Sequence, residues 1–287
     1  MPLIRFMLYS EISVALCALG LGALGQLMLK SQVDWAILGL ISSTTFLFYT
    51  AERNLTRPEP EQAIFPEKSR WLADHRGINL GLLLGGALFS IALTPRLSFS
   101  NLLGLGGFGV FAVCYSIIPF PRSVPGQPPL GLKRFSWLKS FSMVLVWTYM
   151  TLLLPALEIG NFLRAELLVL GLIWVGWIFG NSLLFDIRDL EVDRLQGCLT
   201  LAAKLGRRKA HQLIYFLGFF ELALILVYGQ LFNEPWSWVM MFTSLAFLVF
   251  NRLSEKRETL GLGFYTLADL TLILPTLVLG LQYYSSL

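Results

Sequence analysis

Long apolar stretches recur along the whole chain and are separated by short polar segments. A helix that crosses about 30 Å of hydrocarbon needs roughly 17 to 25 mainly apolar residues. Strands of a membrane barrel would instead alternate polar and apolar positions, and no stretch of this sequence does so. The pattern predicts an all-α membrane protein with nine transmembrane helices, near residues 11–29, 34–51, 78–94, 99–118, 140–157, 164–185, 212–232, 236–250 and 261–284.

Positive charges divide unequally between the two sets of connecting segments. With the N-terminus placed in the cytoplasm, all but three of the 22 lysines and arginines fall on the cytoplasmic side; the exceptions are Lys30, Arg96 and Arg164. Cytoplasmic loops are enriched in these residues. We therefore predict a cytoplasmic N-terminus and a C-terminus on the opposite side. The long breaks at 52–77, 119–139 and 186–211 then share the cytoplasmic face, where any chemistry is expected.

Composition agrees with a membrane environment. The 287 residues are 55% hydrophobic and only 14% charged, and the mean hydropathy is +0.66, whereas soluble domains carry about 25% charged residues. No soluble domain interrupts the apolar runs, so residues 1–287 are expected to form a single domain in the cell (inner or plasma) membrane. The net charge of +4 is accounted for by loop charges that face the bilayer, and no nucleic acid is expected as a partner.

Three aspartates follow the sixth apolar run, in the string "FDIRDLEVDR". If that helix continues, Asp186, Asp189 and Asp193 are spaced i, i+3 and i+7 and share one face. Three carboxylates on one face repel each other near an apolar boundary, so the pattern indicates a compensating cation. Oxygen ligands without a neighbouring histidine or cysteine suit Mg²⁺.

A second interpretation is that these acids only form ion pairs at a solvated helix end, with Arg188 and Arg194. The residues that follow favour the metal site, because the whole string "DIRDLEVDRLQGCLTLAAKLGRRKA" resembles the second aspartate-rich motif of the UbiA-type intramembrane prenyltransferase superfamily. The matching positions are Asp186, Asp189, Asp193, Gly197, Thr200, Leu201, Leu205 and Gly206.

The resemblance implies a UbiA-like bundle of nine helices with two acidic motifs on the cytoplasmic side. It also implies Mg²⁺-dependent transfer of an isoprenyl group from a prenyl diphosphate to a hydrophobic, membrane-associated acceptor, such as a quinone precursor, a tetrapyrrole or a lipid. Asp189 and Asp193 would be catalytic. The implied metal ligands are Asp186, Asp189, Asp193 and Glu52, and the implied diphosphate ligands are Lys133, Arg134, Lys139 and Arg53.

The first acidic motif departs from the family pattern, which reads like N-x-x-x-D-x-x-x-D. This chain has "FYTAERNLTRPEPEQ", which contains no aspartate. "YTAER" resembles the form YNxxR of some bacterial members, with Thr50 in place of asparagine, and this assigns the first motif's work to Glu52 and Arg53. The departure keeps an alternative open, a non-catalytic UbiA-like protein that binds an isoprenoid or serves in assembly. A secondary transporter is disfavoured, because no inverted repeat is visible and charges within the spans are few.

A few polar and aromatic residues within or beside the spans leave two interpretations open. Asp269 in the last span either lines the reaction cavity or makes a contact between helices. His75 and His211 are expected at the surface, beside basic residues. Five aromatic residues either stabilise an allylic cation with their ring faces or simply pack: Trp147, Tyr149, Trp174, Trp177 and Tyr265.

Overall fold

The structure, a computed structural model, describes residues 2–29, 32–55, 66–117, 136–160, 165–195, 200–234, 237–256 and 271–278. All regular elements within these ranges are helical. They are α1 (Pro2–Tyr9), α2 (Ile12–Met28), α3 (Trp35–Leu55), α5 (Pro66–Asp74), α6 (Arg76–Leu93), η1 (Thr94–Arg96), α7 (Phe99–Ile117), α8 (Ser136–Thr148), η3 (Tyr149–Leu153), α9 (Leu154–Ile159), α10 (Ala165–Arg188), α11 (Leu190–Leu195), α12 (Leu201–Leu205), α13 (Arg207–Leu231) and α14 (Ser237–Glu255).

The hydropathy pattern located the long helices well. Each of the first eight predicted spans coincides with a helix or, for the fifth, with the consecutive pieces α8, η3 and α9. Residues 271–278 of the ninth are helical, and its remainder lies outside the described residues. Within the described ranges, five helical segments are long and apolar enough to cross a membrane: Arg76–Arg96, Leu138–Ile159, Ala165–Arg188, Arg207–Leu231 and Ser237–Glu255. The full count of nine spans and their orientation stay predictions.

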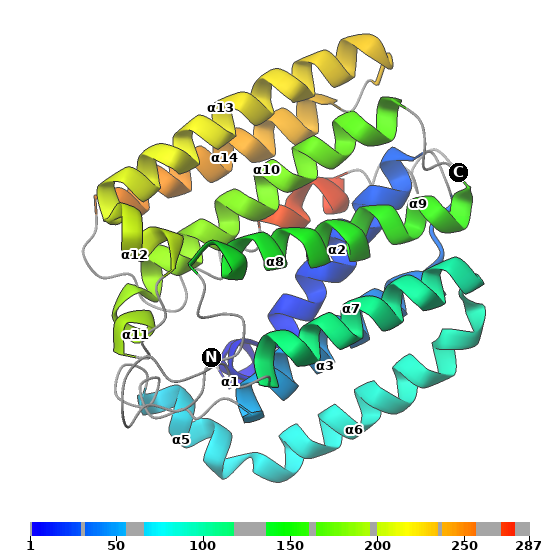
Figure 1. The fold of residues 1–287 in the computed structure, drawn as a ribbon, viewed down its shortest axis with the longest axis vertical. Helices are drawn as coiled ribbons and strands as arrows, with labels where there is room; N and C mark the ends of the chain where they lie inside the picture. The colour runs from blue at the N-terminus through cyan, green and yellow to red at the C-terminus, as the bar shows by residue number, and fades with distance from the viewer. Residues whose placement is uncertain are drawn as a thin grey trace.

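The long helices form a bundle in which α10 is central (Figure 1). One side of α10 packs on α13, which in turn packs on α14, and α10 also contacts α8. The first part of the chain builds a second group, in which α3 lies between α2 and α6. The short helices α1, α5, α11 and α12 gather at one end of the bundle (Figure 1), so α5 lies at the same end as the acidic stretch that follows α10.

Two tryptophans of α10 fill the centre of the core. Trp174 and Trp177 are almost fully buried and their rings lie 5.4 Å apart. The Trp174 indole N–H donates to the hydroxyl of Thr151 at 3.1 Å, and that of Trp177 donates to the hydroxyl of Ser244 at 2.8 Å. Burial with a satisfied N–H is what packing tryptophans require, so packing is the correct interpretation for these two.

The fifth span is interrupted by the π-helical segment η3, which is followed by Pro155 in the first turn of α9. A proline at this position has no N–H to donate to the carbonyl of Thr151, four residues earlier, and π-bulges are one identifiable origin of helix distortions. The Thr151 carbonyl faces Gly25 of α2 so closely that a Cβ on Gly25 would collide with it. The glycine therefore allows α2 to cross the distorted segment at this point.

Two polar contacts join the antiparallel helices α13 and α14. The hydroxyl of Ser244 contacts the buried carboxyl of Glu221. Near the start of α13, His211 Nδ1 lies 2.7 Å from Asn251 Oδ1, and the Asn251 side-chain amide donates to the His211 carbonyl at 3.3 Å. His211 is completely buried, so the surface position expected for it is wrong, because a partner 40 residues away draws it into the helix interface.

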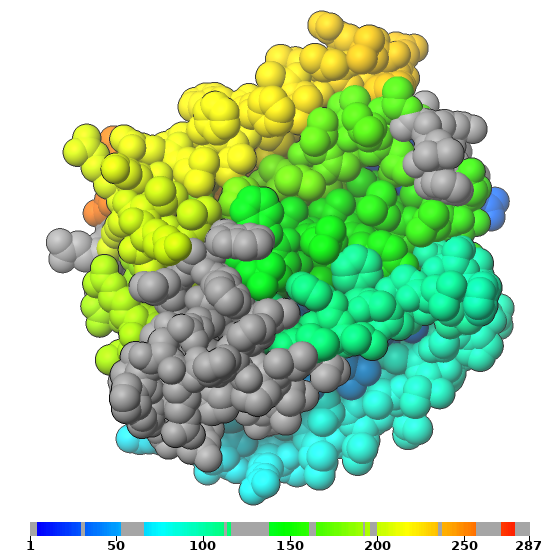
Figure 2. All heavy atoms as spheres, in the orientation of Figure 1, coloured from blue at the N-terminus to red at the C-terminus, as the bar shows by residue number. Residues whose placement is uncertain are grey.

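The outer faces of the bundle carry exposed apolar side chains. Figure 2 shows α6 and α13, in cyan and yellow, forming opposite edges of the molecule. Leu84 and Leu88 are among the exposed residues of α6, and Phe216 and Phe219 are among those of α13. Large exposed apolar areas of this kind are typical of surfaces that face lipid, where they meet no aqueous penalty. The multi-pass apolar helices make this an integral membrane protein.

Candidate functional site

The three aspartates lie where α10 ends and α11 begins. Helical hydrogen bonds continue through the junction, since the amide of Asp189 donates to the Phe185 carbonyl at 2.9 Å and that of Asp193 donates to the Asp189 carbonyl at 2.8 Å. The spacing of seven residues therefore keeps Asp186 and Asp193 on one face, as predicted, and both are buried. Glu191, between them in sequence, is exposed.

Lys139, in the first turn of α8, lies between two of these carboxylates. Its Nζ is 3.1 Å from Asp186 Oδ1 and 3.1 Å from both carboxylate oxygens of Asp193. The next residue, Ser140, donates its hydroxyl to Asp186 Oδ2 at 2.8 Å. Helix α8 thus presents one cation and one hydroxyl to the acidic end of α10, and it holds Asp186 through both of its oxygens.

Asp189 makes a separate pair. The Arg188 guanidinium donates through Nε and Nη2 to the two carboxylate oxygens of Asp189, at 2.6 and 2.7 Å, and lies 4.6 Å above the Phe185 ring. Burial alone would raise the pKa of Asp189, but Arg188 and, more distantly, Lys139 hold it below its usual range. Asp189 is therefore anionic at neutral pH.

Asp193 has a different environment from Asp189. Burial, followed by repulsion from the carboxylates of Asp186 and Asp189, raises the pKa of Asp193 to about 6, although Lys139 acts in the opposite direction. A raised pKa means that the anion is held at a cost. More positive charge at this point than Lys139 provides would stabilise the cluster.

The donor set fits a hard divalent cation. Among the described residues no three histidine, cysteine, aspartate or glutamate side chains gather as a ready-made metal site. Asp186 and Asp193 nevertheless converge on a single cation, the ammonium of Lys139, which stands where a metal ion would receive both carboxylates. All donors are oxygens, and Mg²⁺ is commonly held by one or two carboxylates with phosphate oxygens completing its shell. Asp186 and Asp193 are therefore the described residues that could hold such a cation.

The segment "YTAER" forms the last turns of α3. Thr50 is buried, and its hydroxyl has no hydrogen-bond partner within the described part of the chain. Glu52 is half-buried, and its predicted role as a metal ligand stays a prediction. The side chains of Arg53, Lys133 and Arg134 lie outside the described residues, so Lys139 is the predicted diphosphate ligand whose surroundings are known.

The remaining aromatic residues predicted to line a cavity differ in their burial and in their hydrogen-bond partners. Trp147 is half-buried, and its indole N–H donates to the Tyr49 hydroxyl at 3.1 Å, at the start of "YTAER". Tyr149 is buried and donates its hydroxyl to Asn101 Oδ1 at 3.3 Å, which is a contact between α7 and η3. Tyr265 lies outside the described residues, as does Asp269.

Sequence reasoning missed Ser140 and a second ion pair at the same end of the bundle. Lys68 of α5 lies 3.5 Å from Glu11, and both side chains are largely buried. Its charge also reaches Asp189, whose pKa it helps to lower. Nothing in the sequence marked this pair, and Ser140 was marked only by its position next to Lys139.

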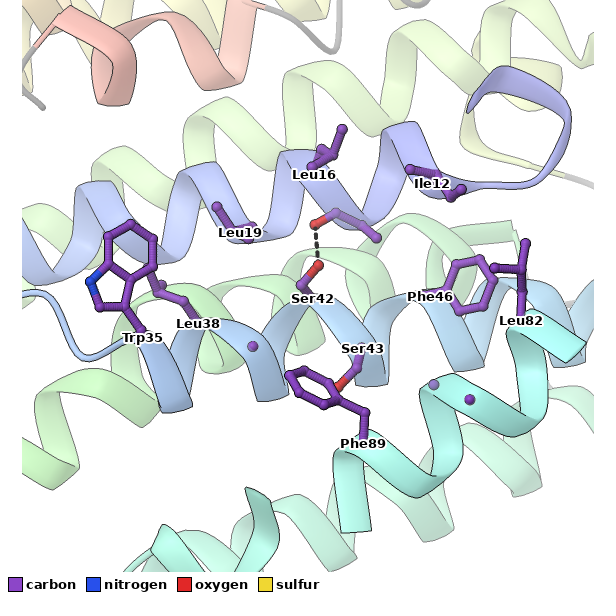
Figure 3. Close-up of a pocket in the computed structure, with 14 residues that line it drawn as sticks. Ile12, Leu16, Leu19, Trp35, Leu38, Ser42, Ser43, Phe46, Leu82 and Phe89 are labelled. Carbon is purple, nitrogen blue, oxygen red and sulfur yellow. Dashed lines mark hydrogen bonds between the residues drawn. The ribbon is translucent and has the colours of Figure 1, made fainter. Parts of the chain in front are cut away.

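An apolar groove of about 520 Å³ lies elsewhere, between α2, α3 and α6 (Figure 3). Its hydroxyls already have partners: Ser42 donates to the Ala15 carbonyl at 3.1 Å, and Ser43 accepts from Ser90 at 2.7 Å. Phe89 and Trp35 are among the residues that line the groove, and both are largely exposed. The groove offers hydrocarbon contact and no charge, so it is distinct from the acidic cluster.

Comparison with known proteins decides the family. The model of the UbiA prenyltransferase family matches residues 68–280. The chain belongs to the UbiA prenyltransferase family. The matched range includes the whole aspartate cluster and Lys139, whereas "YTAER", at 49–53, precedes it. Membership in the UbiA family indicates prenyl transfer from a prenyl diphosphate as the activity, and so a transferase.

The fold agrees with the family. The chain is similar to the apo structure of a UbiA homolog from Aeropyrum pernix K1, with a TM-score of 0.63 and 14% sequence identity; the alignment covers 93% of this chain and 98% of that one. At this identity the similarity concerns the UbiA fold alone. No curated protein sequence matches the chain.

Proposed function

We propose that the protein is a Mg²⁺-dependent prenyltransferase that moves an isoprenyl group from a prenyl diphosphate to a hydrophobic acceptor in the membrane. The observation that carries the proposal is the convergence of Asp186 and Asp193, both buried, on one cation at the end of the bundle. Two carboxylates in this position are costly without a cation. In a member of a prenyltransferase family, such a pair of carboxylates would bind the metal ion that holds the substrate diphosphate.

The residues of the cluster have different tasks in this proposal. Asp186 is held by Ser140 and is the better-oriented metal ligand. Asp193 is the second ligand, and its raised pKa indicates a carboxylate that gains from a stronger cation. Asp189, kept anionic by Arg188, is the further metal ligand proposed from the sequence and acts with Asp193 in catalysis.

The leaving group is a diphosphate, so cations must stabilise the negative charge that develops on its oxygens. Mg²⁺, when bound, supplies most of that stabilisation as a Lewis acid. Lys139 is the described cation that contacts both Asp186 and Asp193, and Lys133, Arg134 and Arg53 are proposed as further diphosphate ligands from the sequence. Glu52 is proposed as an additional metal ligand that takes over the missing first motif.

The membrane topology and the class of acceptor are proposed from the sequence. We infer nine spans with the N-terminus in the cytoplasm, in the cell membrane, because the positive charges accumulate in one set of loops. This orientation puts the cluster on the cytoplasmic side. The acceptor belongs to a class with apolar character, such as a quinone precursor, a tetrapyrrole or a lipid.

The proposal is tested with the purified protein in detergent, incubated with a labelled prenyl diphosphate, with or without Mg²⁺. We expect Mg²⁺-dependent binding and release of diphosphate. Asp189→Asn should lower the rate by about 10²-fold or more, which is the usual effect of removing one electrostatic contribution to a transition state. Glu191→Gln, on the exposed side of the same helical stretch, is the matched control and should stay within about twofold, as expected of a surface substitution.

Two results would contradict the proposal. If the unmutated protein neither binds prenyl diphosphate in a Mg²⁺-dependent way nor releases diphosphate, the enzyme interpretation fails. A membrane protein that binds an isoprenoid without catalysis would then be the remaining interpretation. If Asp189→Asn and Glu191→Gln behave alike, Asp189 has no role in the reaction.

A further inference from the structure

The ammonium of Lys139 occupies the position where the two aspartates could hold a divalent cation. Its Nζ contacts Asp186 and both oxygens of Asp193 at 3.1 Å. The two carboxylates are nearly inaccessible, with side chains 3% and 6% exposed, whereas the lysine side chain is 25% exposed. Of these three side chains, the lysine is therefore the one that reaches solvent.

A divalent cation and the ammonium cannot occupy this position together. Both would contact the same oxygens, and like charges at contact distance repel strongly in a partly buried site. A metal that binds alone must displace Lys139 and so break its ion pairs with Asp186 and Asp193. An arriving diphosphate removes that difficulty, because its oxygens accept the displaced ammonium.

The local structure permits this exchange without movement of the backbone. Lysine carries its charge on a flexible stem with four carbons, so the head group can turn while α8 stays in place. Asp186 keeps its hydrogen bond from Ser140 at 2.8 Å, and so it remains oriented when the lysine leaves.

We propose that Lys139 is a resident counter-ion that excludes a divalent cation from the site until a diphosphate arrives to accept its ammonium. The inference rests on the proposed function, since it gives the binding order at the same site. Metal and diphosphate then bind together, and each tightens the binding of the other by the same factor, as thermodynamic linkage requires.

The test measures binding of Mn²⁺, a spectroscopic probe of the divalent cation, by electron paramagnetic resonance, with and without inorganic pyrophosphate. In the unmutated protein, pyrophosphate should tighten Mn²⁺ binding by about tenfold or more, within the usual range of coupling between two ligands. Lys139→Gln should bind Mn²⁺ without pyrophosphate about tenfold more tightly than the unmutated protein does, and pyrophosphate should have little further effect. Lys204→Gln, at an exposed position of α12 at the same end, should behave as the unmutated protein.

Two controls keep the result interpretable. Lys139→Arg retains the charge and should keep the weak Mn²⁺ binding seen without pyrophosphate. Lys139→Gln leaves two buried carboxylates without the Lys139 ammonium, so we expect it to unfold more easily. In that case Mn²⁺ alone should raise its melting temperature, whereas it should not raise that of the unmutated protein.

The counter-ion inference is overturned if Lys139→Gln binds Mn²⁺ no more tightly than the unmutated protein, or if Mn²⁺ alone fails to stabilise it. Release of diphosphate from prenyl diphosphate by the unmutated protein tests the proposed function separately. If the unmutated protein turns over and Lys139→Gln binds Mn²⁺ no more tightly than it does, only the counter-ion inference is refuted. Tighter Mn²⁺ binding in Lys139→Gln, together with no turnover by the unmutated protein, supports the counter-ion and refutes the enzyme.

Discussion

Two serines of α8 make a matched pair for testing how the acidic cluster is held. Ser140 and Ser142 are both buried, at 0% and 5% exposure. The hydroxyl of Ser140 donates to Asp186, whereas that of Ser142 has no hydrogen-bond partner among the described residues. The substitution of each by alanine removes the same atom from the same helix, so the difference isolates the hydrogen bond to Asp186.

The expected magnitudes follow from these environments. A hydrogen bond to a charged group contributes about 1.5–3 kcal/mol, and Ser140→Ala should lower the free energy of unfolding by that amount. This corresponds to a change of about 10- to 150-fold in the unfolding equilibrium, at 1.4 kcal/mol for each factor of ten. Ser142→Ala removes a buried hydroxyl that is not satisfied, so its effect should lie within about 0.5 kcal/mol of zero or be slightly stabilising.

The measurement is a denaturant titration of the protein in detergent micelles, followed by tryptophan fluorescence. Both variants should unfold in one transition that is compared with that of the unmutated protein. Equal destabilisation by the two substitutions would refute the reasoning, because it would mean that packing and not the hydrogen bond to Asp186 sets the cost. No destabilisation by Ser140→Ala would refute it too.

Further substitutions test the packing of the bundle by thermal melting in detergent. Gly25→Ala should lower the free energy of unfolding by about 3 kcal/mol, because the new methyl group collides with the Thr151 carbonyl. Gly81→Ala adds a carbon that has no atom within 4 Å, so it should raise the free energy of unfolding by about 0.5–1 kcal/mol. Changes of the same sign in the two variants would contradict this reasoning. Ser244→Ala should lower it by about 1–3 kcal/mol, because it removes the buried partner of Glu221. Glu221→Gln keeps a hydrogen-bonding group and should melt close to the unmutated protein, so a large loss there would show that the carboxylate charge itself matters.

The spacing of apolar and polar residues was enough to predict the long helices and part of the candidate site. Helix length and apolar content depend on consecutive residues, so the long helices could be located directly. The same periodicity placed Asp186 and Asp193 on one face, because that relation is local to one helix. Residues close in sequence therefore gave reliable predictions, in the spans and in the acidic stripe alike.

Partners distant in sequence could not be identified in this way. Lys139 lies 54 residues before Asp193, and the sequence marked it only as a general diphosphate ligand, not as the cation between two aspartates. His211 was placed at the surface because its neighbours are basic, although it is buried in the bundle with its Nδ1 against Asn251. These assignments depend on how helices pack, which hydropathy does not encode.

The polar contact between α13 and α14 also has a consequence for biosynthesis. Glu221 lies in the apolar part of α13, and an ionisable side chain in the middle of a lone membrane helix is costly to insert. Ser244 of α14 offers its partner, and the two helices are joined by a short connection. Entry of α13 into the bilayer is therefore easiest when α14 accompanies it, so that the two helices leave the translocon as one hairpin.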